Sequence, residues 1–130
     1  MRKISEIMDR KLVAVSRNAS MRAALKLAKV SGVDVLPILE NNELIGVVNV
    51  EEIQRYISED PRREEDTVKK LSKRPIFLEA DESTRSAIGK IIRSGLSRMP
   101  VVDSRSTMRC IGTVNATDLL KAEAKGLRKR

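Results

Sequence analysis

The sequence predicts a mixed α/β fold of the α+β type, in which two β-α-β-β-α copies pack sheet to sheet about a pseudo-twofold axis. The same succession of apolar and polar segments occurs twice in the chain of 130 residues, with the two copies about 63 residues apart. Each copy contains an amphipathic helix pattern, then two short apolar segments and a second helix. A small sheet cannot bury both of its faces alone, so the two copies are expected to cover each other.

The first helix of each copy shows the clearest periodicity. Apolar residues recur at i, i+3, i+4 and i+7, which places them on one helix face. Ser20 and Ser83 precede these helices as N-cap candidates, and Gly32 and Gly95 follow them as stop residues. The residues that share the spacing are Met21, Ala24, Leu25 and Ala28 in the first copy and Thr84, Ala87, Ile88 and Ile91 in the second.

Short apolar segments on either side of these helices are predicted as strands. Asn41 and Asn42 form a hairpin turn in the first copy, and residues 103–107 form a looser one in the second. The predicted strands are residues 11–15, 35–39, 44–48, 76–78, 99–102 and 108–114, and the predicted helices are residues 20–31, 83–94 and two that begin near residues 49 and 117.

The domain organisation follows from the repeat. Residues 1–57 form the first motif, residues 75–122 the second motif, and residues 123–130 a basic C-terminal tail. Residues 58–74 form a highly charged surface connection that leads into the second repeat. A short helix around residues 64–71 is compatible with the sequence of this connection.

The composition excludes most enzyme classes. The chain has no histidine and one cysteine, so imidazole-based catalysis, thiolate metal clusters and an internal disulfide are unavailable. The 18 Asp and Glu residues show no paired acid–base pattern, so no enzyme, no metal and no catalytic cofactor is predicted. Apolar residues make up 41% of the chain with few aromatics, which predicts an aliphatic core that includes Cys110.

No segment of the sequence suggests a membrane or a secreted location. No apolar run approaches the ~20 residues of a membrane span. The first residues show no apolar signal-peptide region. The sequence therefore predicts a soluble, cytoplasmic protein.

The positive charge gathers at the C-terminal end. The net charge is +8, and the last ten residues carry five basic side chains against Glu123. Basic tails attract polyanions, so a nucleic-acid-associated protein with the repeats as scaffold is the alternative function, although aromatic residues for base stacking are nearly absent. The tail is expected to be dispensable for folding, so that the chain could end at Lys121.

The residues with the clearest functional meaning lie where the last strand of each copy gives way to a helix. Free backbone N–H groups and the positive end of the helix dipole suit a phosphate there. An acid just inside the helix can accept hydrogen bonds from a sugar diol. The structural alternative is a capping box, in which the Asn and the acid satisfy the free N–H groups. The matched residues are Pro37 and Pro100, Gly46 and Gly112, Asn49 and Asn115, and Glu52 and Asp118.

The apolar-Pro-Val-Val-Asp segment 99–103 and the Gly-x-x-polar-x-x-acid segment 112–118 occur together, and the first copy repeats their pattern. This combination resembles the CBS-domain family in its tandem form, over residues 4–122. The resemblance implies a non-catalytic regulatory module, a homodimeric ligand sensor that modulates an unidentified partner protein. The implied ligand is an adenine nucleotide between the repeats, AMP first, with ADP and ATP left open. Residues 4–8 are implied to be an apolar lead-in that packs beside the second repeat.

The resemblance also implies which residues hold the nucleotide. Asp118 matches the acid that holds the ribose hydroxyls, while Thr117 and Arg98 match positions that contact phosphate. The base is implied to lie against backbone near Leu12 and Val13. The implied nucleotide-binding residues are Ser97, Arg98, Asn115, Thr117, Asp118, Leu12 and Val13.

Asn115 departs from the family pattern, which usually has Ser or Thr three residues before the helix acid. An amide can still donate to phosphate, so binding stays possible. A solvated side chain at the start of a strand explains Arg98 equally well. In the first copy Glu51 and Glu52 would face an incoming phosphate and Val35 replaces Arg98, so that site is expected to be empty or weak.

Overall fold

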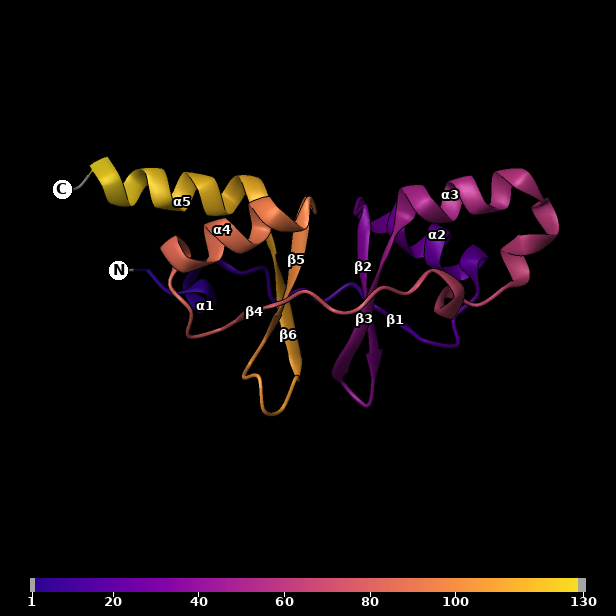
Figure 1. Cartoon of the computed structure of the whole chain (residues 1–130), viewed down its shortest axis with the longest axis horizontal. Helices are drawn as coiled ribbons and strands as arrows, with labels where there is room; N and C mark the ends of the chain where they lie inside the picture. The colour runs from indigo at the N-terminus through magenta and orange to yellow at the C-terminus, as the bar shows by residue number, and fades with distance from the viewer. Residues whose placement is uncertain (1, 129–130) are drawn as a thin grey trace. The chain divides into compact units, whose positions relative to one another are not determined.

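The computed structural model describes residues 2–128, with side chains described for residues 2–125 (Figure 1). It contains two three-stranded sheets, each with helices, so the predicted mixed α/β class is confirmed. The chain divides into two compact units. Unit 1 consists of the described residues of Met1–Leu12 and Ile76–Arg130, and unit 2 consists of Val13–Pro75.

Unit 2 is built on a sheet with strand order β1-β2-β3, in which β1 is parallel to β2 and β2 is antiparallel to β3. Its helices include two 3₁₀ turns, η1 and η2, in the charged connection. The elements are β1 (Val15–Ser16), α2 (Met21–Ser31), β2 (Val35–Glu40), β3 (Glu43–Asn49), α3 (Val50–Glu59), η1 (Pro61–Glu65) and η2 (Val68–Leu71).

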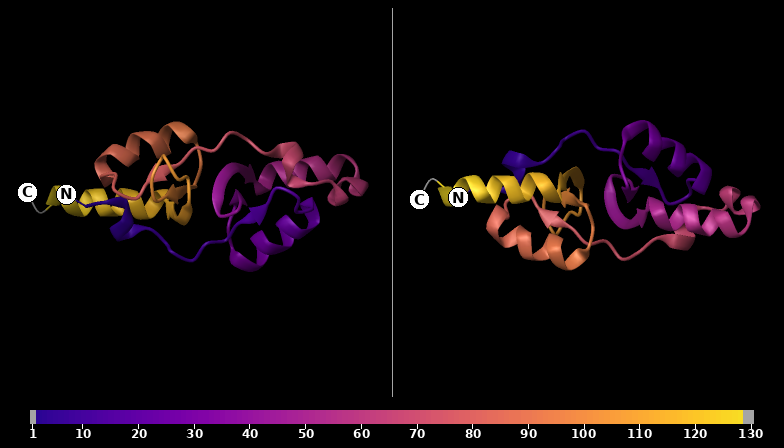
Figure 2. Two further views of the ribbon diagram at one scale, coloured as in Figure 1. Left: turned by 90° about the horizontal axis from the view of Figure 1, so that it is seen from below. Right: turned by 90° about the horizontal axis from the view of Figure 1, so that it is seen from above.

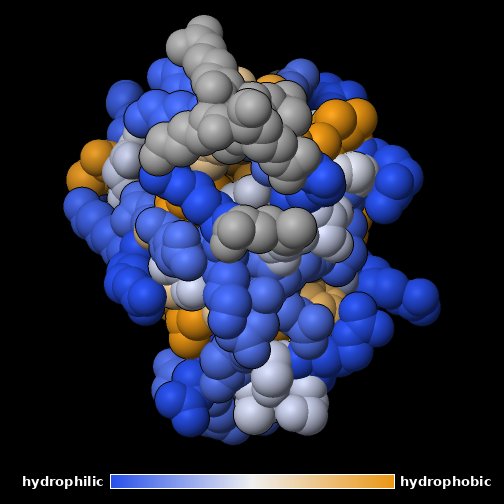
Figure 3. Space-filling model, turned by 90° about the vertical axis from the view of Figure 1, so that its left-hand side faces the viewer, coloured by the Kyte–Doolittle hydropathy of each residue, from blue (hydrophilic) through white to orange (hydrophobic). Residues whose placement is uncertain are grey.

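Unit 1 repeats this topology with the order β4-β5-β6. In Figure 1, α4 and α5 lie side by side next to this sheet. The surface of this end of the molecule is mostly hydrophilic, with small separate hydrophobic areas (Figure 3). The elements are α1 (Ile4–Ile7), β4 (Leu78–Glu79), α4 (Thr84–Ser94), β5 (Arg98–Val102), β6 (Cys110–Asn115) and α5 (Ala116–Arg128).

The predicted starts and ends of α2 and α4 are confirmed. The Ser20 hydroxyl accepts a hydrogen bond from Ala23 N at 3.0 Å, and the Ser83 hydroxyl accepts one from Ser86 N at 3.1 Å. Both bonds satisfy N–H groups that lack a partner inside the helix. Gly32 and Gly95 each end their helix with φ of 68°, a conformation that glycine adopts without strain.

The outer strands are shorter than predicted. The predicted strand 11–15 is wrong in extent, because only Val15 and Ser16 pair with β2. The predicted strand 76–78 is likewise reduced to β4, which pairs with β5 through two residues. The chain passes from one unit to the other at residues 12–13 and 75–76. The residues next to these points therefore do not extend the sheet of either unit.

The two hairpins differ as predicted. Asn41 and Asn42 have φ values of 51° and 67°, which confirms the tight turn between β2 and β3. The longer loop of unit 1 contains Met108 with φ of 56°. Met108 therefore interrupts the extended backbone, and β6 begins at Cys110 rather than at residue 108.

The charged connection packs on unit 2. It forms η1 and η2 instead of one helix over residues 64–71. Met21 N donates to Asp66 O at 2.8 Å and Val68 N donates to Ala19 O at 2.9 Å, which fastens the connection beside the start of α2. The Val68 side chain is buried in the core of unit 2.

The N-terminal lead-in belongs to unit 1, which confirms its predicted position beside the second repeat. Ile4 N donates to Glu82 O at 2.8 Å, and Thr84 N donates to Arg2 O at 3.0 Å. The Ile4 side chain is fully buried in the core that also contains Leu78 and Leu119. Both views of Figure 2 place α1 beside α5.

The expectation that the chain could end at Lys121 without consequence is wrong. Helix α5 continues to Arg128, and Ala122 is buried. The Glu123 carboxylate accepts hydrogen bonds from Thr84 Oγ1 at 2.9 Å and from Arg85 Nε at 3.3 Å, both on α4.

Within residues 2–128, no helix combines the length and the apolar character that a bilayer crossing requires.

Each sheet gains a further edge contact from a segment outside the β-α-β-β-α pattern. Asp9 pairs with Thr113 on β6, and Lys73 pairs with Val47 on β3. The glycines next to these pairs make room for the incoming backbone. A Cβ on Gly112 would lie 2.5 Å from Asp9 O, whereas a Cβ on Gly46 would first meet the Ser72 hydroxyl and then Lys73 O at 3.1 Å.

We expect Gly112→Ala to lower the free energy of unfolding by about 1–3 kcal/mol, because the Asp9 carbonyl is backbone and must move. Gly46→Ala should cost less, since the Ser72 hydroxyl can rotate away and Lys73 O needs to shift only slightly. Urea unfolding of both variants measures the difference. Equal losses would show that the Asp9 segment moves freely along the edge of β6.

Candidate functional site

The structure brings five of the predicted site residues together at one end of the sheet of unit 1. Arg98 begins β5 and pairs with Asn115, the last residue of β6. Helix α5 starts at the next residue, and its first N–H group, on Ala116, donates to Ser97 O at 2.8 Å. Ser97, Arg98, Asn115, Thr117 and Asp118 therefore surround a single junction of two strands and a helix.

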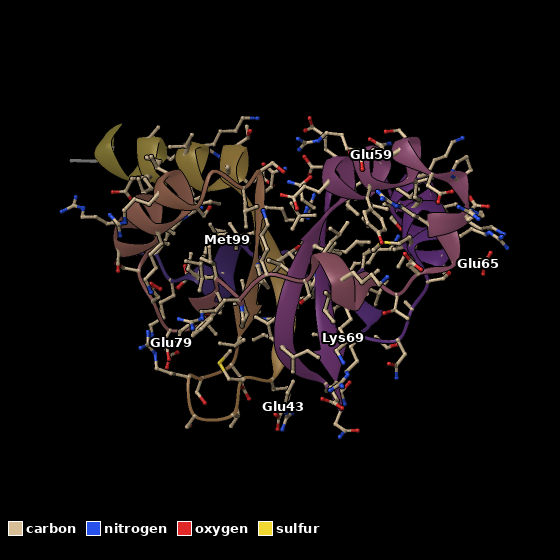
Figure 4. All side chains as sticks on the ribbon, turned by 45° about the vertical axis from the view of Figure 1, so that its right-hand side comes forward. Glu43, Glu59, Glu65, Lys69, Glu79 and Met99 are labelled. Atoms are coloured by element: carbon tan, nitrogen blue, oxygen red, sulfur yellow. The ribbon has the colours of Figure 1, made fainter. Side chains whose placement is uncertain are left out.

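The side chain of Arg98 lies on the sheet face opposite α4 and α5. Met99, labelled in Figure 4, is fully buried in the core of unit 1. Successive side chains of a strand point to opposite faces, so Arg98 points away from that core. There its Nη1 donates to Thr113 Oγ1 at 3.0 Å.

Asn115 is the N-cap of α5. Its Oδ1 accepts a hydrogen bond from Thr117 N at 2.7 Å, as Asn49 Oδ1 does from Glu51 N at 2.9 Å in unit 2. This half of the predicted capping box is present in both units. The acid does not complete it: Glu52 pairs with Lys73 instead, and Asp118 has no hydrogen-bond or ion-pair partner among the residues that the structure describes.

The difference between Glu52 and Asp118 has a structural cause. In unit 2 the edge segment carries Lys73, whose ammonium group pairs with the Glu52 carboxylate. In unit 1 the residue at the matching edge position is Asp9, which cannot neutralise Asp118. The Asp118 carboxylate is exposed and keeps its acceptor capacity for a ligand.

The pair Arg98 and Thr113 is also confined to unit 1. The matching residues of unit 2 are Val35 and Val47, which are both buried. Sequence reasoning identified Arg98 but missed Thr113. The difference between Thr113 and Val47 at matched positions of the repeat is the signal that could have found it.

At the junction itself, Thr117 is exposed in the first turn of α5. Leu12 is the last residue of the N-terminal part of unit 1, and Val13 is the first residue of unit 2, where it packs against the core of that unit. The placement of Leu12 and Val13 beside the nucleotide base stays a prediction.

Two hollows of unit 2 lie elsewhere. One, of about 550 Å³, lies between α2 and α3. The other, of about 490 Å³, contains a network of paired charges, in which Tyr56 donates to Asp66 at 2.5 Å and Arg63 pairs with Glu59 at 2.7 Å. Figure 4 shows Glu59 and Glu65 in this part of unit 2. The basic side chains at this hollow, Arg62, Arg63 and Lys70, already pair with carboxylates, so they form structural ion pairs.

The described residues offer little else for chemistry. Cys110 is buried in β6, and burial raises the pKa of its thiol, which agrees with the predicted role as a core residue. No group of three or more Cys, Asp or Glu side chains within residues 2–125 is arranged to hold a metal ion. The junction in unit 1 therefore groups hydrogen-bond donors with one carboxylate that has no partner among the described residues.

Comparisons with known proteins agree with the repeat and the fold. Residues 4–59 and 68–125 each match the CBS domain. Protein MJ0188 of Methanocaldococcus jannaschii, described as uncharacterized, is 30% identical over 122 residues, which is 93% of this chain and 44% of that protein. The chain thus spans less than half the length of this relative.

Two solved structures share the fold at low sequence identity. The CBS domain pair of protein MJ0100, in complex with 5′-methylthioadenosine and S-adenosyl-L-methionine, has a TM-score of 0.81 at 20% identity, covering 97% of this chain and 98% of that one. CBSX2 in complex with AMP has a TM-score of 0.75 at 23% identity, covering 100% of both chains. Because the family match extends over both copies of the repeat, the chain belongs to the CBS-domain family.

Proposed function

We propose that this chain is a non-catalytic regulatory module that binds an adenine nucleotide, AMP in the first place, at the junction of β5, β6 and α5. One observation carries the proposal. Asp118 has no partner within the described residues, while the matching Glu52 is engaged by Lys73. A carboxylate held at a helix start with free acceptors is suited to the two hydroxyls of a ribose.

The ligand class is supported by the related structures. The molecules bound to the MJ0100 domain pair and to CBSX2 all contain adenosine, and hence a ribose diol. Of these, only AMP carries a phosphate. Arg98 supplies a cationic donor at the same junction in this chain, which favours a phosphorylated ligand over a neutral one.

The proposal places one nucleotide site in each chain. In unit 2, Val35 stands where unit 1 has Arg98, and the Glu52 carboxylate is already paired. No arginine stands at that position to attract a phosphate, and the neighbouring Glu51 would repel one. Calorimetry of AMP binding should therefore give one site per chain.

Regulation follows from linkage between the ligand and a partner. A ligand changes the affinity for a partner only if it binds two states of the module with different affinity. We include a homodimer in the proposal. It is supported by the exposed apolar side chains Ile92 and Leu120 on α4 and α5, at positions where unit 2 has Lys29 and Gln54.

A thermal-shift titration tests the nucleotide proposal. A ligand at ~100 times its dissociation constant stabilises a protein by about 2.7 kcal/mol, which raises the melting temperature by several degrees. We expect this shift with AMP and none with inorganic phosphate alone. If AMP, ADP and ATP all leave the melt unchanged at millimolar concentration, the adenine-nucleotide proposal fails.

A further inference from the structure

We infer that Thr113 is a positioning residue that holds Arg98 for the phosphate, and so determines the preference of the site for phosphorylated over neutral adenosine ligands. The inference rests on the proposed function and adds a residue to it. It starts from the hydrogen bond of 3.0 Å between Arg98 Nη1 and Thr113 Oγ1. This bond joins the long, flexible side chain of Arg98 to the buried side chain of Thr113.

Thr113 is fixed by its backbone and by burial. Its N–H donates to Asp9 O at 3.0 Å, and its carbonyl accepts from Asp9 N at 2.8 Å. The side chain is only 3% exposed, and a β-branched side chain has few rotamers. The hydroxyl therefore presents an acceptor at one fixed place beside the start of β5.

Arg98 gains from this fixed acceptor. A free arginine side chain samples many rotamers, and ordering it on binding weakens a ligand's affinity. The bond to Thr113 uses one donor and leaves the other N–H groups of the guanidinium for an anion. A phosphate can then be bound by a guanidinium that is already in place.

Unit 2 shows that the two residues go together. Val35 and Val47 occupy the positions of Arg98 and Thr113, and both are buried. If the Thr113 hydroxyl only stabilised the sheet, a threonine would be expected at the matching position of β3 as well. Here it occurs only in the unit that has the guanidinium and the free carboxylate of Asp118.

The test compares phosphorylated and neutral ligands on the full chain. Dissociation constants for AMP, adenosine and 5′-methylthioadenosine are measured by calorimetry for the wild type and for Thr113→Val, which keeps the shape of the side chain. We expect AMP to bind about five- to tenfold more weakly to Thr113→Val. Adenosine and 5′-methylthioadenosine should keep their wild-type affinities, because neither carries a phosphate.

Two further variants make the result decisive. Thr113→Ser retains the hydroxyl and should restore AMP binding. Arg98→Met should show the same selective loss, and the double variant should lose no more than Arg98→Met alone. An equal loss for AMP and adenosine, or no loss for either, would overturn the inference. A wild type that binds none of the three ligands would instead overturn the proposed function.

Discussion

Asp118→Ala is expected to lower the affinity for AMP by about 10- to 100-fold, the largest effect on binding that we expect from a single substitution. The change removes the carboxylate proposed to accept hydrogen bonds from both ribose hydroxyls. Calorimetry measures the affinity directly. The melting shift with AMP should shrink in parallel.

The same substitution should leave the folded state nearly as stable as before. The Asn115 side chain caps α5, and among the described residues the Asp118 carboxylate contributes no hydrogen bond to this cap. A loss of about 0.5–1 kcal/mol with unchanged AMP affinity is the result expected of a helix cap. That outcome would contradict the binding role of Asp118.

Glu52→Ala is the matched control. It removes the partner of Lys73 in unit 2, an ion pair in which the Lys73 side chain is 61% exposed and the Glu52 side chain 26%. A pair so open to water contributes about 0–1 kcal/mol. AMP affinity should therefore stay at the wild-type value, and a loss equal to that of Asp118→Ala would argue against a site confined to unit 1.

The largest effect on stability is expected from Ile4→Ala, at about 2–5 kcal/mol of the free energy of unfolding. The Ile4 side chain is 0% exposed and contributes to the core formed with Leu78, Met99 and Leu119. Truncation leaves a cavity where the lead-in meets the strands and α5. Urea unfolding measures the loss.

Val30→Ala is the control for this prediction, because it truncates an aliphatic side chain on α2 that is 80% exposed. It should change the stability by no more than about 0.5 kcal/mol. Equal effects of the two substitutions would mean that the lead-in is not part of the folded core. In that case the contact between Asp9 and Thr113 would lose its structural basis as well.

The local features of the fold could be predicted from the sequence because each depends on neighbouring residues. Ser20, Ser83, Gly32 and Gly95 mark helix ends through their own side chains or backbone freedom, and the structure confirms them. The outer strands could not be bounded in this way. Their length depends on how far β2 and β5 offer a partner, which no apolar pattern within residues 11–15 or 76–78 reveals.

The grouping of the candidate site was predictable, whereas its electrostatics were not. Arg98, Asn115 and Asp118 belong to one strand pair and the helix that follows it, so the repeat alone brought them together. The contrast between Lys73 and Asp9 comes from edge segments far from their strands in the sequence. Only the pairing of those segments shows that one acid is neutralised and the other is free.

The composite origin of unit 1 has a consequence for synthesis on the ribosome. Unit 2 is continuous, so all of its contacts are available once residue 75 has emerged. Ile4 and Asp9 leave the ribosome before unit 2, whereas their partners on α5 and β6 leave it after unit 2. The apolar side chains of the N-terminal segment therefore stay unburied while unit 2 folds, because the residues that they pack against are synthesised later.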